Sequence, residues 1–104
     1  MDTAVVYMTA RDREEALRIA RTLVEERLVA CVNVLAGVTS VYWWEDAVQE
    51  NLEVALIAKT KESLVGAVAR RVKELHSYEC PCVVSWSIDA GSDVYLDWIA
   101  RETR

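Results

Sequence analysis

Glycine and proline are scarce in this sequence, since its 104 positions include three glycines and one proline. This scarcity leaves no linker, internal repeat or low-complexity tract, and no glycine-rich loop of the kind that cradles a phosphate group. There is also a single histidine, so no nucleophile, base and orienting residue can be recognised as a set. These absences favour a binding protein over an enzyme.

Positive charge is scarce as well. The 12 Lys and Arg residues are outnumbered by 17 Asp and Glu residues, which gives a formal net charge of −5. The basic residues cluster once, from Arg70 to Lys73. Binding to nucleic acid needs a net basic surface, so we expect no nucleic-acid partner.

No segment suits export or a membrane. Residues Met1 to Thr3 do not begin a basic and then apolar leader. The longest nearly apolar run, 28–38, contains Asn33 and is too short to span a bilayer. Three cysteines are an odd number, which without a leader indicates free thiols in a reducing compartment. We therefore expect a cytoplasmic protein with no membrane partner.

The sequence does contain enough apolar material for one core. Hydrophobic residues make up 53% of the chain and aromatic residues 8%, which predicts a single domain over residues 1–104. Periodicity predicts strands 4–9, 29–44, 51–59 and 82–88, with a turn at Glu45 and Asp46. It also predicts a helix from Asp12, with Glu15 as capping-box partner, to about Leu28. A second helix, capped by Thr60, would bury Leu64, Val65, Val68, Val72 and Leu75, and a third, 92–102, would bury Leu96 and Ile99.

This order, β-α-β-β-α-β with a terminal helix, is that of the ferredoxin-like α+β fold. Strand 29–44 is too long for it: at about 3.3 Å per residue it would reach roughly 50 Å, against a diameter of roughly 33 Å for a compact domain. The hairpin must bend, at Ala36 and Gly37, or project beyond its sheet. Trp43 and Trp44 must point to opposite faces, so one would pack in its own chain and the other against a symmetric partner. The alternative is a monomer with a bent hairpin and one surface Trp.

Four stretches of the sequence resemble the CutA family of divalent-cation tolerance proteins. They are RTLVEERLVACVNVLAGVTSVYWWE, the pair Lys59-Thr60, ELHSYECP and YLDWI. The resemblance runs from about Val5 to Trp98. It implies a ferredoxin-like subunit in a homotrimer whose long hairpins pair between subunits, and a cytoplasmic role connected with divalent metals, above all copper.

The resemblance also implies a polar cluster in a cleft between subunits. Its positions here are Cys31, Trp44, Glu53, Lys59, His76 and Tyr78. The chain departs from the family pattern in having Asp46-Ala47 for Gly-Lys, Ser77 for the proline of His-Pro-Tyr, and Cys82 for a glutamate after Pro81. Copper ligands of some relatives correspond to Met8 and Leu75-His76, so only part of that set is kept. The lost carboxylate argues against a hard-metal or acid–base role at position 82.

His76, Cys80 and Cys82 are the candidate metal ligands. A C-x-C sequence on an extended segment puts both thiols on one side, and soft sulfur and imidazole ligands favour Cu(I) or Zn over Mg or Ca. The alternatives are structural. His76 can complement the negative end of the second helix, and Cys31, in an apolar run, can be a small core residue.

Lys59 has two alternative roles, an ion pair with Glu53 at the edge of a cleft or the capture of an anionic ligand. Capture would suit a trimeric small-ligand sensor resembling the PII signalling proteins, with clefts around Lys59, His76 and Tyr78. A third class is a purely structural scaffold trimer. The interpretation that combines most features is a non-catalytic, copper-binding homotrimer of the CutA type.

Overall fold

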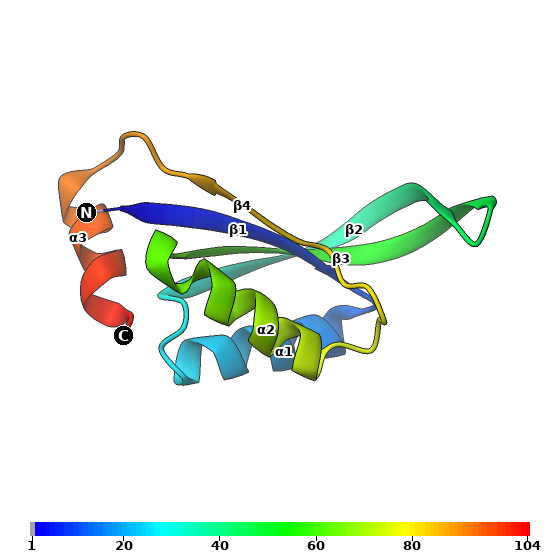
Figure 1. The fold of residues 1–104 in the computed structure, drawn as a ribbon, viewed down its shortest axis with the longest axis horizontal. Coiled ribbons are helices and arrows are strands. Elements are labelled where there is room, and N and C mark those ends of the chain that lie inside the picture. Colours follow the sequence, from blue (N-terminus) through cyan, green and yellow to red (C-terminus); the bar gives the residue numbers. More distant parts are fainter. Residues whose placement is uncertain (1) are drawn as a thin grey trace.

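The computed structural model describes residues 2–104, which fold into one antiparallel sheet with helices packed against it (Figure 1). The elements are β1 (Thr3–Ala10), α1 (Arg13–Glu25), β2 (Cys31–Trp44), β3 (Ala47–Lys61), the 3₁₀ turn η1 (Glu62–Leu64), α2 (Val65–Leu75), β4 (Val83–Ser87) and α3 (Asp93–Glu102). The predicted ferredoxin-like α+β fold with an additional C-terminal helix is confirmed. Among these residues, no helix is both long and apolar enough to cross a membrane.

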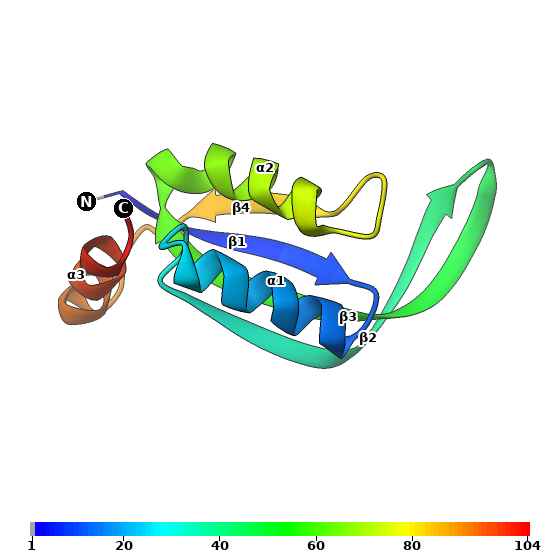
Figure 2. The ribbon, with the colours of Figure 1, turned by 90° about the horizontal axis from the view of Figure 1, so that it is seen from below.

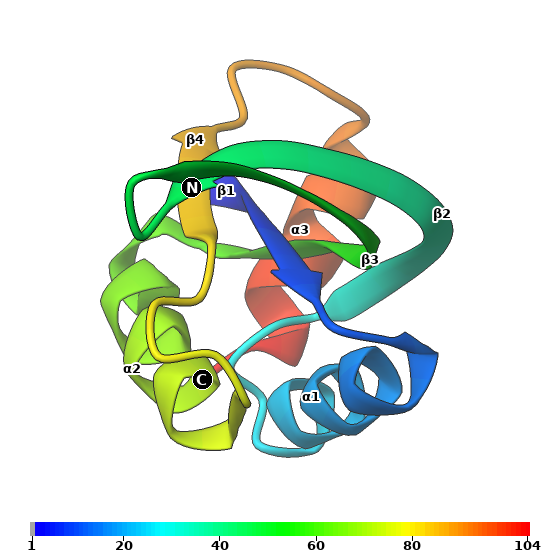
Figure 3. The ribbon, with the colours of Figure 1, turned by 90° about the vertical axis from the view of Figure 1, so that its right-hand side faces the viewer.

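The strands lie in the order β2-β3-β1-β4, and each neighbouring pair is antiparallel. Helices α1 and α2 lie side by side against one face of this sheet, as Figures 2 and 3 show. Helix α3 lies beyond the end of the sheet at which β1 begins (Figure 1). The opposite face has neither α1 nor α2 against it, which leaves it available for other contacts.

Period-two alternation in the strands places the core between the sheet and the two helices. Val6 and Met8 in β1 and Leu56 in β3 are buried there. The residues of α1 and α2 that pack against them are Ala16, Ile19, Ala20, Leu23, Val65, Val68, Val72 and Leu75. The predicted inner face of the second helix is thus confirmed except for Leu64, which lies outside this cluster. In α3, Ile99 is fully buried, as predicted, and Leu96 is half-buried.

The two predicted helix caps have different outcomes. Asp12 caps α1, because its side chain accepts a hydrogen bond from the Glu15 N–H at 2.9 Å. Thr60 does not cap α2, and that prediction was wrong. It lies within β3, where its hydroxyl donates to the Leu28 carbonyl at 2.6 Å. Strand β3 runs on to Lys61 and η1 precedes α2, so Thr60 fastens the strand to the end of the α1–β2 connection instead.

The β2–β3 hairpin both bends and projects. A bulge separates Leu35 from Val38, and Gly37 within it has φ +84°, a conformation that favours glycine. Glu45 and Asp46 form a two-residue turn with φ of 50° and 61°, the pattern of a type I′ hairpin turn. Figures 1 and 2 show the far half of the hairpin extending beyond the helices. The molecule is accordingly elongated, with principal extents of 44 × 25 × 22 Å.

Neither tryptophan of the hairpin is buried within the chain. Trp43 is 75% exposed and Trp44 is 42% exposed. The prediction that one indole packs in its own subunit holds only in part. Trp44 lies beside Tyr78 and Cys80 of its own chain but stays partly exposed, whereas Trp43 keeps three quarters of its surface exposed.

Candidate functional site

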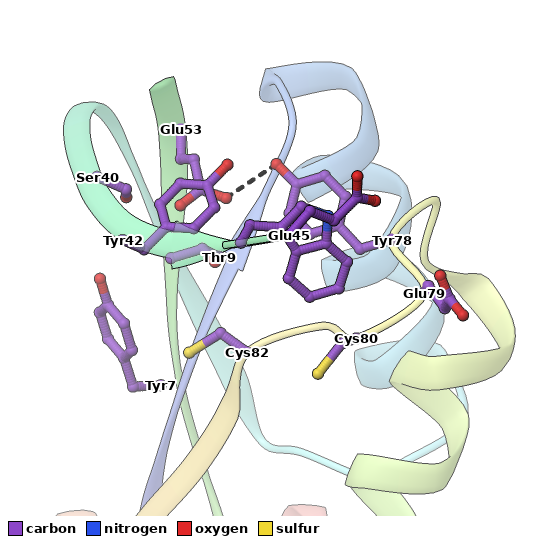
Figure 4. Close-up of a pocket in the computed structure, with 11 residues that line it drawn as sticks. Tyr7, Thr9, Ser40, Tyr42, Glu45, Glu53, Tyr78, Glu79, Cys80 and Cys82 are labelled. Carbon is purple, nitrogen blue, oxygen red and sulfur yellow. Dashed lines mark hydrogen bonds between the residues drawn. The ribbon is translucent and has the colours of Figure 1, made fainter. Parts of the chain in front are cut away.

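A cavity of about 610 Å³ lies where the hairpin passes the segment that leads into β4 (Figure 4). Its wall comes from parts of the chain that are far apart in sequence. The lining residues are Tyr7 and Thr9 of β1, Ser40, Tyr42 and Trp44 of β2, Glu45 of the turn, Glu53 of β3, and Tyr78, Glu79, Cys80 and Cys82 of the segment before β4. Several residues predicted for the site thus meet around one space, namely Trp44, Glu53, Tyr78, Cys80 and Cys82.

Glu53 and Tyr78 are joined directly. The Tyr78 hydroxyl donates to Glu53 Oε2 at 2.9 Å, the bond drawn in Figure 4. Burial, together with this carboxylate, raises the pKa of Tyr78. The phenol therefore stays a neutral donor and holds the carboxylate against the cavity wall.

The thiols of Cys80 and Cys82 both line the cavity, and neither forms a disulfide. Figure 4 shows both side chains on the irregular segment that leads into β4. Cys80 is exposed and Cys82 is half-buried. Burial, with the nearby Glu53 carboxylate, raises the pKa of the Cys82 thiol. A metal ion at Cys82 must therefore displace a proton that this environment favours.

His76 is held by internal hydrogen bonds on both ring nitrogens. Its Nε2 donates to the Thr9 carbonyl at 2.8 Å, and its Nδ1 accepts the Tyr78 N–H at 3.0 Å. Because a carbonyl only accepts and an amide N–H only donates, the ring is the neutral Nε2–H tautomer. The side chain is completely buried, and no ring nitrogen is free to bind a metal ion.

Glu15 of α1 contacts the segment that carries His76. Its carboxylate is buried and accepts from the Arg11 N–H at 3.0 Å and from the Ser77 N–H at 2.9 Å. Burial alone would raise its pKa, but the hydrogen bonds from Ser77 and Arg11 hold that pKa below its usual value. The sequence predicted a capping box, in which this carboxylate would accept from the Asp12 N–H. Only the half in which Asp12 accepts from the Glu15 N–H is formed, because the carboxylate accepts from Arg11 and Ser77 instead. The link from Glu15 to Ser77, 62 positions away, had no sequence signal.

The structure does not bring His76 together with Cys80 and Cys82 as one ligand set. Residues 2–104 contain no group of three or more His, Cys, Asp or Glu side chains placed to hold a metal ion. The reason is that His76 turns inward to Thr9, whereas the two thiols face the cavity (Figure 4). A three-ligand site within one chain is therefore not formed by these residues.

Cys31 and Lys59 lie together at another place on the sheet, since they are partners in the β2–β3 register. The Cys31 thiol is 3.4 Å from the Tyr95 hydroxyl, and this contact together with burial raises the pKa of Tyr95 to about 12. Lys59 Nζ donates to Asn33 Oδ1 at 2.5 Å. Lys59 and Glu53 are six positions apart on one strand, about 20 Å at 3.3 Å per residue. The alternative in which Lys59 pairs with Glu53 is therefore not formed within the described chain.

The sequence matches the family model described as "CutA1 divalent ion tolerance protein" over residues 4–102. "Protein CutA 1, chloroplastic" of Oryza sativa subsp. japonica is 44% identical over 100 residues, 96% of this chain and 56% of the rice protein. "Divalent-cation tolerance protein CutA" of Pyrococcus horikoshii is 40% identical over 100 residues, 96% of this chain and 97% of that protein. The chain thus spans little more than half of the plant relative and nearly all of the archaeal one.

Solved structures agree with the sequence match. The divalent cation tolerance protein (Cut A1) from Thermus thermophilus superposes with a TM-score of 0.95 at 42% identity and covers 98% of this chain and 99% of its own. CutA1 from Oryza sativa superposes with a TM-score of 0.97 at 42% identity, over 100% of this chain and 95% of its own. Sequence and fold lead to the same conclusion: the chain belongs to the CutA1 divalent ion tolerance family.

Proposed function

We propose that this protein contributes to divalent-cation tolerance by binding a soft metal ion, copper above all, as a non-catalytic homotrimer of the cytoplasm. The observation that carries the proposal is that Cys80 and Cys82, two positions apart on the segment before β4, line one cavity (Figure 4). The link to cations is supported by the relatives from Pyrococcus horikoshii and Thermus thermophilus, which are named divalent-cation tolerance proteins.

Thiols narrow the choice of metal. Sulfur ligands are soft and favour Cu(I) and Zn over Mg, Ca or Mn. One chain supplies two cavity thiols, and a tetrahedral zinc site needs four ligands. Cu(I) tolerates a lower coordination number, so copper fits two thiols better than zinc does. The neighbouring Glu53 carboxylate adds negative charge beside Cys82.

A trimer is supported by apolar surface that one chain leaves uncovered. Trp43 is 75% exposed and Leu52 is 74% exposed, both on the projecting hairpin. Further exposed apolar side chains are Val41, Tyr42, Trp44, Val48, Val84 and Trp86. An exposed apolar patch of this kind marks an interaction surface, and symmetric copies are its simplest occupant. A cytoplasmic location is supported by three unpaired thiols.

The sensor alternative gains no support from these contacts. It places Lys59, His76 and Tyr78 around a cleft between subunits, whereas within one chain Lys59 bonds to Asn33 and does not line the cavity. No observation therefore favours it over metal binding.

The proposal is tested by calorimetric titration of the reduced protein with Cu(I). Cys80→Ser combined with Cys82→Ser should lower the affinity at least about tenfold, because each thiolate is a soft ligand that oxygen does not replace. Cys31→Ser is the matched control and should leave the affinity unchanged, since that thiol contacts Tyr95 and does not line the cavity. Wild-type affinity should be higher near about pH 7.5 than near about pH 5.5, because binding releases protons. Equal affinity in wild type and the double variant would show adventitious binding and refute the metal site.

A further inference from the structure

The face of the sheet that α1 and α2 leave free carries two patches of opposite charge along β3. Val54, Leu56 and Ala58 belong to the core cluster under the helices, so strand alternation turns Glu53 and Lys59 to the free face. These two residues lie six positions apart, about 20 Å at 3.3 Å per residue. They therefore form separate patches of one chain.

The patch around Glu53 is acidic. The carboxylates of Glu45, Glu53 and Glu79 line the cavity there, and no Lys, Arg or His is among the described lining residues. None of the ion pairs formed within residues 2–104 includes these three side chains. Glu53 is 9% exposed and accepts a hydrogen bond from the Tyr78 hydroxyl. A carboxylate buried to this degree requires a cation opposite it.

The patch around Lys59 is the complement of the acidic one. Lys59 Nζ donates to the side-chain oxygen of Asn33, which is a neutral amide. No ion pair formed within residues 2–104 includes Lys59. The described chain thus holds a half-buried ammonium group and a buried carboxylate on one face, each without an opposite charge.

Apolar side chains share this face with the two patches. The register forms two neighbouring rows across β4, β1 and β3, which are Val84, Tyr7 and Ile57, and then Trp86, Val5 and Lys59. Val84 and Trp86 are each more than half exposed in one chain. Exposed apolar surface of this kind marks an interface.

A cyclic trimer brings unlike patches together. Each interface of a ring is head to tail, so one surface of a chain meets a different surface of the next chain. Two patches of opposite charge that cannot reach each other within a chain meet this requirement. Complementary charges also determine which surfaces pair.

From these features we infer that each subunit interface contains an ion pair between Glu53 of one subunit and the partner's Lys59. The cavity is then one half of an intersubunit site, which the next copy of the chain closes. This assigns Lys59 the first of its two alternative roles, with the ion pair formed between chains. The inference rests on the trimer of the proposed function and adds the charge pair that specifies it.

Charge reversal tests the pair. Glu53→Lys or Lys59→Glu places like charges opposite each other at every interface. Either change should raise the concentration at which half of the trimer dissociates by at least about a hundredfold. The variant with both changes restores opposite charges and should assemble at least about tenfold more tightly than either single variant. Light scattering on dilution, in urea below the unfolding transition, measures this concentration.

Glu14→Lys and Lys73→Glu are the matched controls. They make the same charge changes at exposed positions of α1 and α2, which cover the other face of the sheet. Each control should assemble within about threefold of wild type. Circular dichroism shows whether each variant keeps its secondary structure.

Mixing the two single variants shows that the pair forms between chains. Wherever a Glu53→Lys chain meets a Lys59→Glu chain, lysine again faces glutamate. Trimers of two chains of one variant and one of the other have two such interfaces. Native mass spectrometry of the mixture should therefore show these mixed trimers in preference to trimers of either variant alone. A pair formed within one chain would gain nothing from mixing.

Neutral variants keep the test available if a reversed variant fails to fold. Glu53→Gln and Lys59→Gln each remove the pair without adding a like charge. Because either change alone already breaks the pair, the two effects on trimer dissociation should be less than additive in the combined variant. Full additivity would show that the two side chains do not interact.

The inference is overturned if the double reversal assembles no more tightly than the single reversals, or if mixing favours no mixed trimer. Charge changes at positions 53 and 59 that act no more strongly than the controls would show that the patches meet something other than another copy. These failures are distinguishable from failure of the proposed function. A monomeric wild-type protein refutes the trimer itself, whereas a wild-type trimer that ignores these changes refutes only the charge pair.

Discussion

On the helix-covered face of the sheet, Val6, Leu56 and Val68 are completely buried, whereas Trp43 and Leu52 on the hairpin keep about three quarters of their surface exposed. The carboxylates of the two regions also differ in their partners. Under the helices, the Glu15 carboxylate accepts hydrogen bonds from two backbone N–H groups, while in the cavity the carboxylates of Glu45, Glu53 and Glu79 have no ion pair within the described chain.

This contrast separates the part of the molecule that stabilises the subunit from the part that meets partners. A single chain satisfies the first region by itself, through period-two and helical burial. The second region has apolar area and charge left over, which are the features of an interaction surface. Folding and binding are therefore expected to respond to different substitutions.

The largest expected effect comes from the helix-covered face. Leu23 of α1 is completely buried, so Leu23→Ala should lower the free energy of unfolding by about 2–5 kcal/mol. Leu52→Ala removes the same atoms from a side chain that is 74% exposed in one chain and should act mainly on association. Urea unfolding gives the first quantity, and light scattering on dilution gives the second. Equal loss of unfolding free energy in both variants would contradict the separation of the two regions.

A smaller effect is expected at Glu15. Glu15→Gln should lower the free energy of unfolding by about 1–3 kcal/mol, because the neutral amide accepts more weakly from the Ser77 and Arg11 N–H groups. The folded pKa of Glu15 lies below its ordinary value of 4.5. The carboxylate's contribution is therefore fully present above about pH 4.5 and is lost as the pH falls through the folded pKa.

Thermal or urea unfolding, from neutral pH down to the acid range, measures this pH dependence of the unfolding free energy. The difference in unfolding free energy between wild type and Glu15→Gln should shrink as the pH falls below about 4.5. Glu14→Gln is the control, since Glu14 is exposed in the same turn of α1, and should change stability by less than about 0.5 kcal/mol. A difference that stays constant with pH would exclude the proposed role of the Glu15 carboxylate.

The smallest effect is expected at the hairpin turn. Asp46 has φ 61°, so Asp46→Gly should raise the free energy of unfolding by up to about 1 kcal/mol by relieving a left-handed conformation. Ala47→Gly, at the first position of β3, should lower it by about 0.5–1 kcal/mol instead. Denaturant unfolding of both variants checks the sign. A loss of stability on Asp46→Gly would show that the aspartate side chain contributes more than the backbone strain costs.

The fold could be predicted from the sequence because its signals are local. The spacing of Ile19 and Leu23 in α1, the alternation in β1 and the length of the hairpin each report on neighbouring residues. Gly37 marked the bend correctly for the same reason. The prediction for Thr60 was wrong because a threonine before a helical pattern is equally compatible with a helix cap and with the end of a strand. The hydrogen bond to Leu28 that decides between the two is a tertiary contact.

The site was predictable only in part. Tyr78, Cys80 and Cys82 lie close in sequence and do line the cavity. His76 lies beside them in sequence, but its direction depends on the distant Thr9 carbonyl, which holds the ring inward. The roles of Glu15 and Tyr7 also depend on contacts across the sheet and between the helices, and single-sequence patterns carry no record of such contacts.

The central claim is that the helix-covered region is complete in one chain while the hairpin requires further copies of it. Light scattering of the wild-type protein at low micromolar concentration tests this claim most directly. A mass of three times the monomer is expected, with a loss of trimer on Trp44→Ala, since truncation of a buried aromatic side chain costs about 3–5 kcal/mol. A stable wild-type monomer at that concentration would contradict the claim.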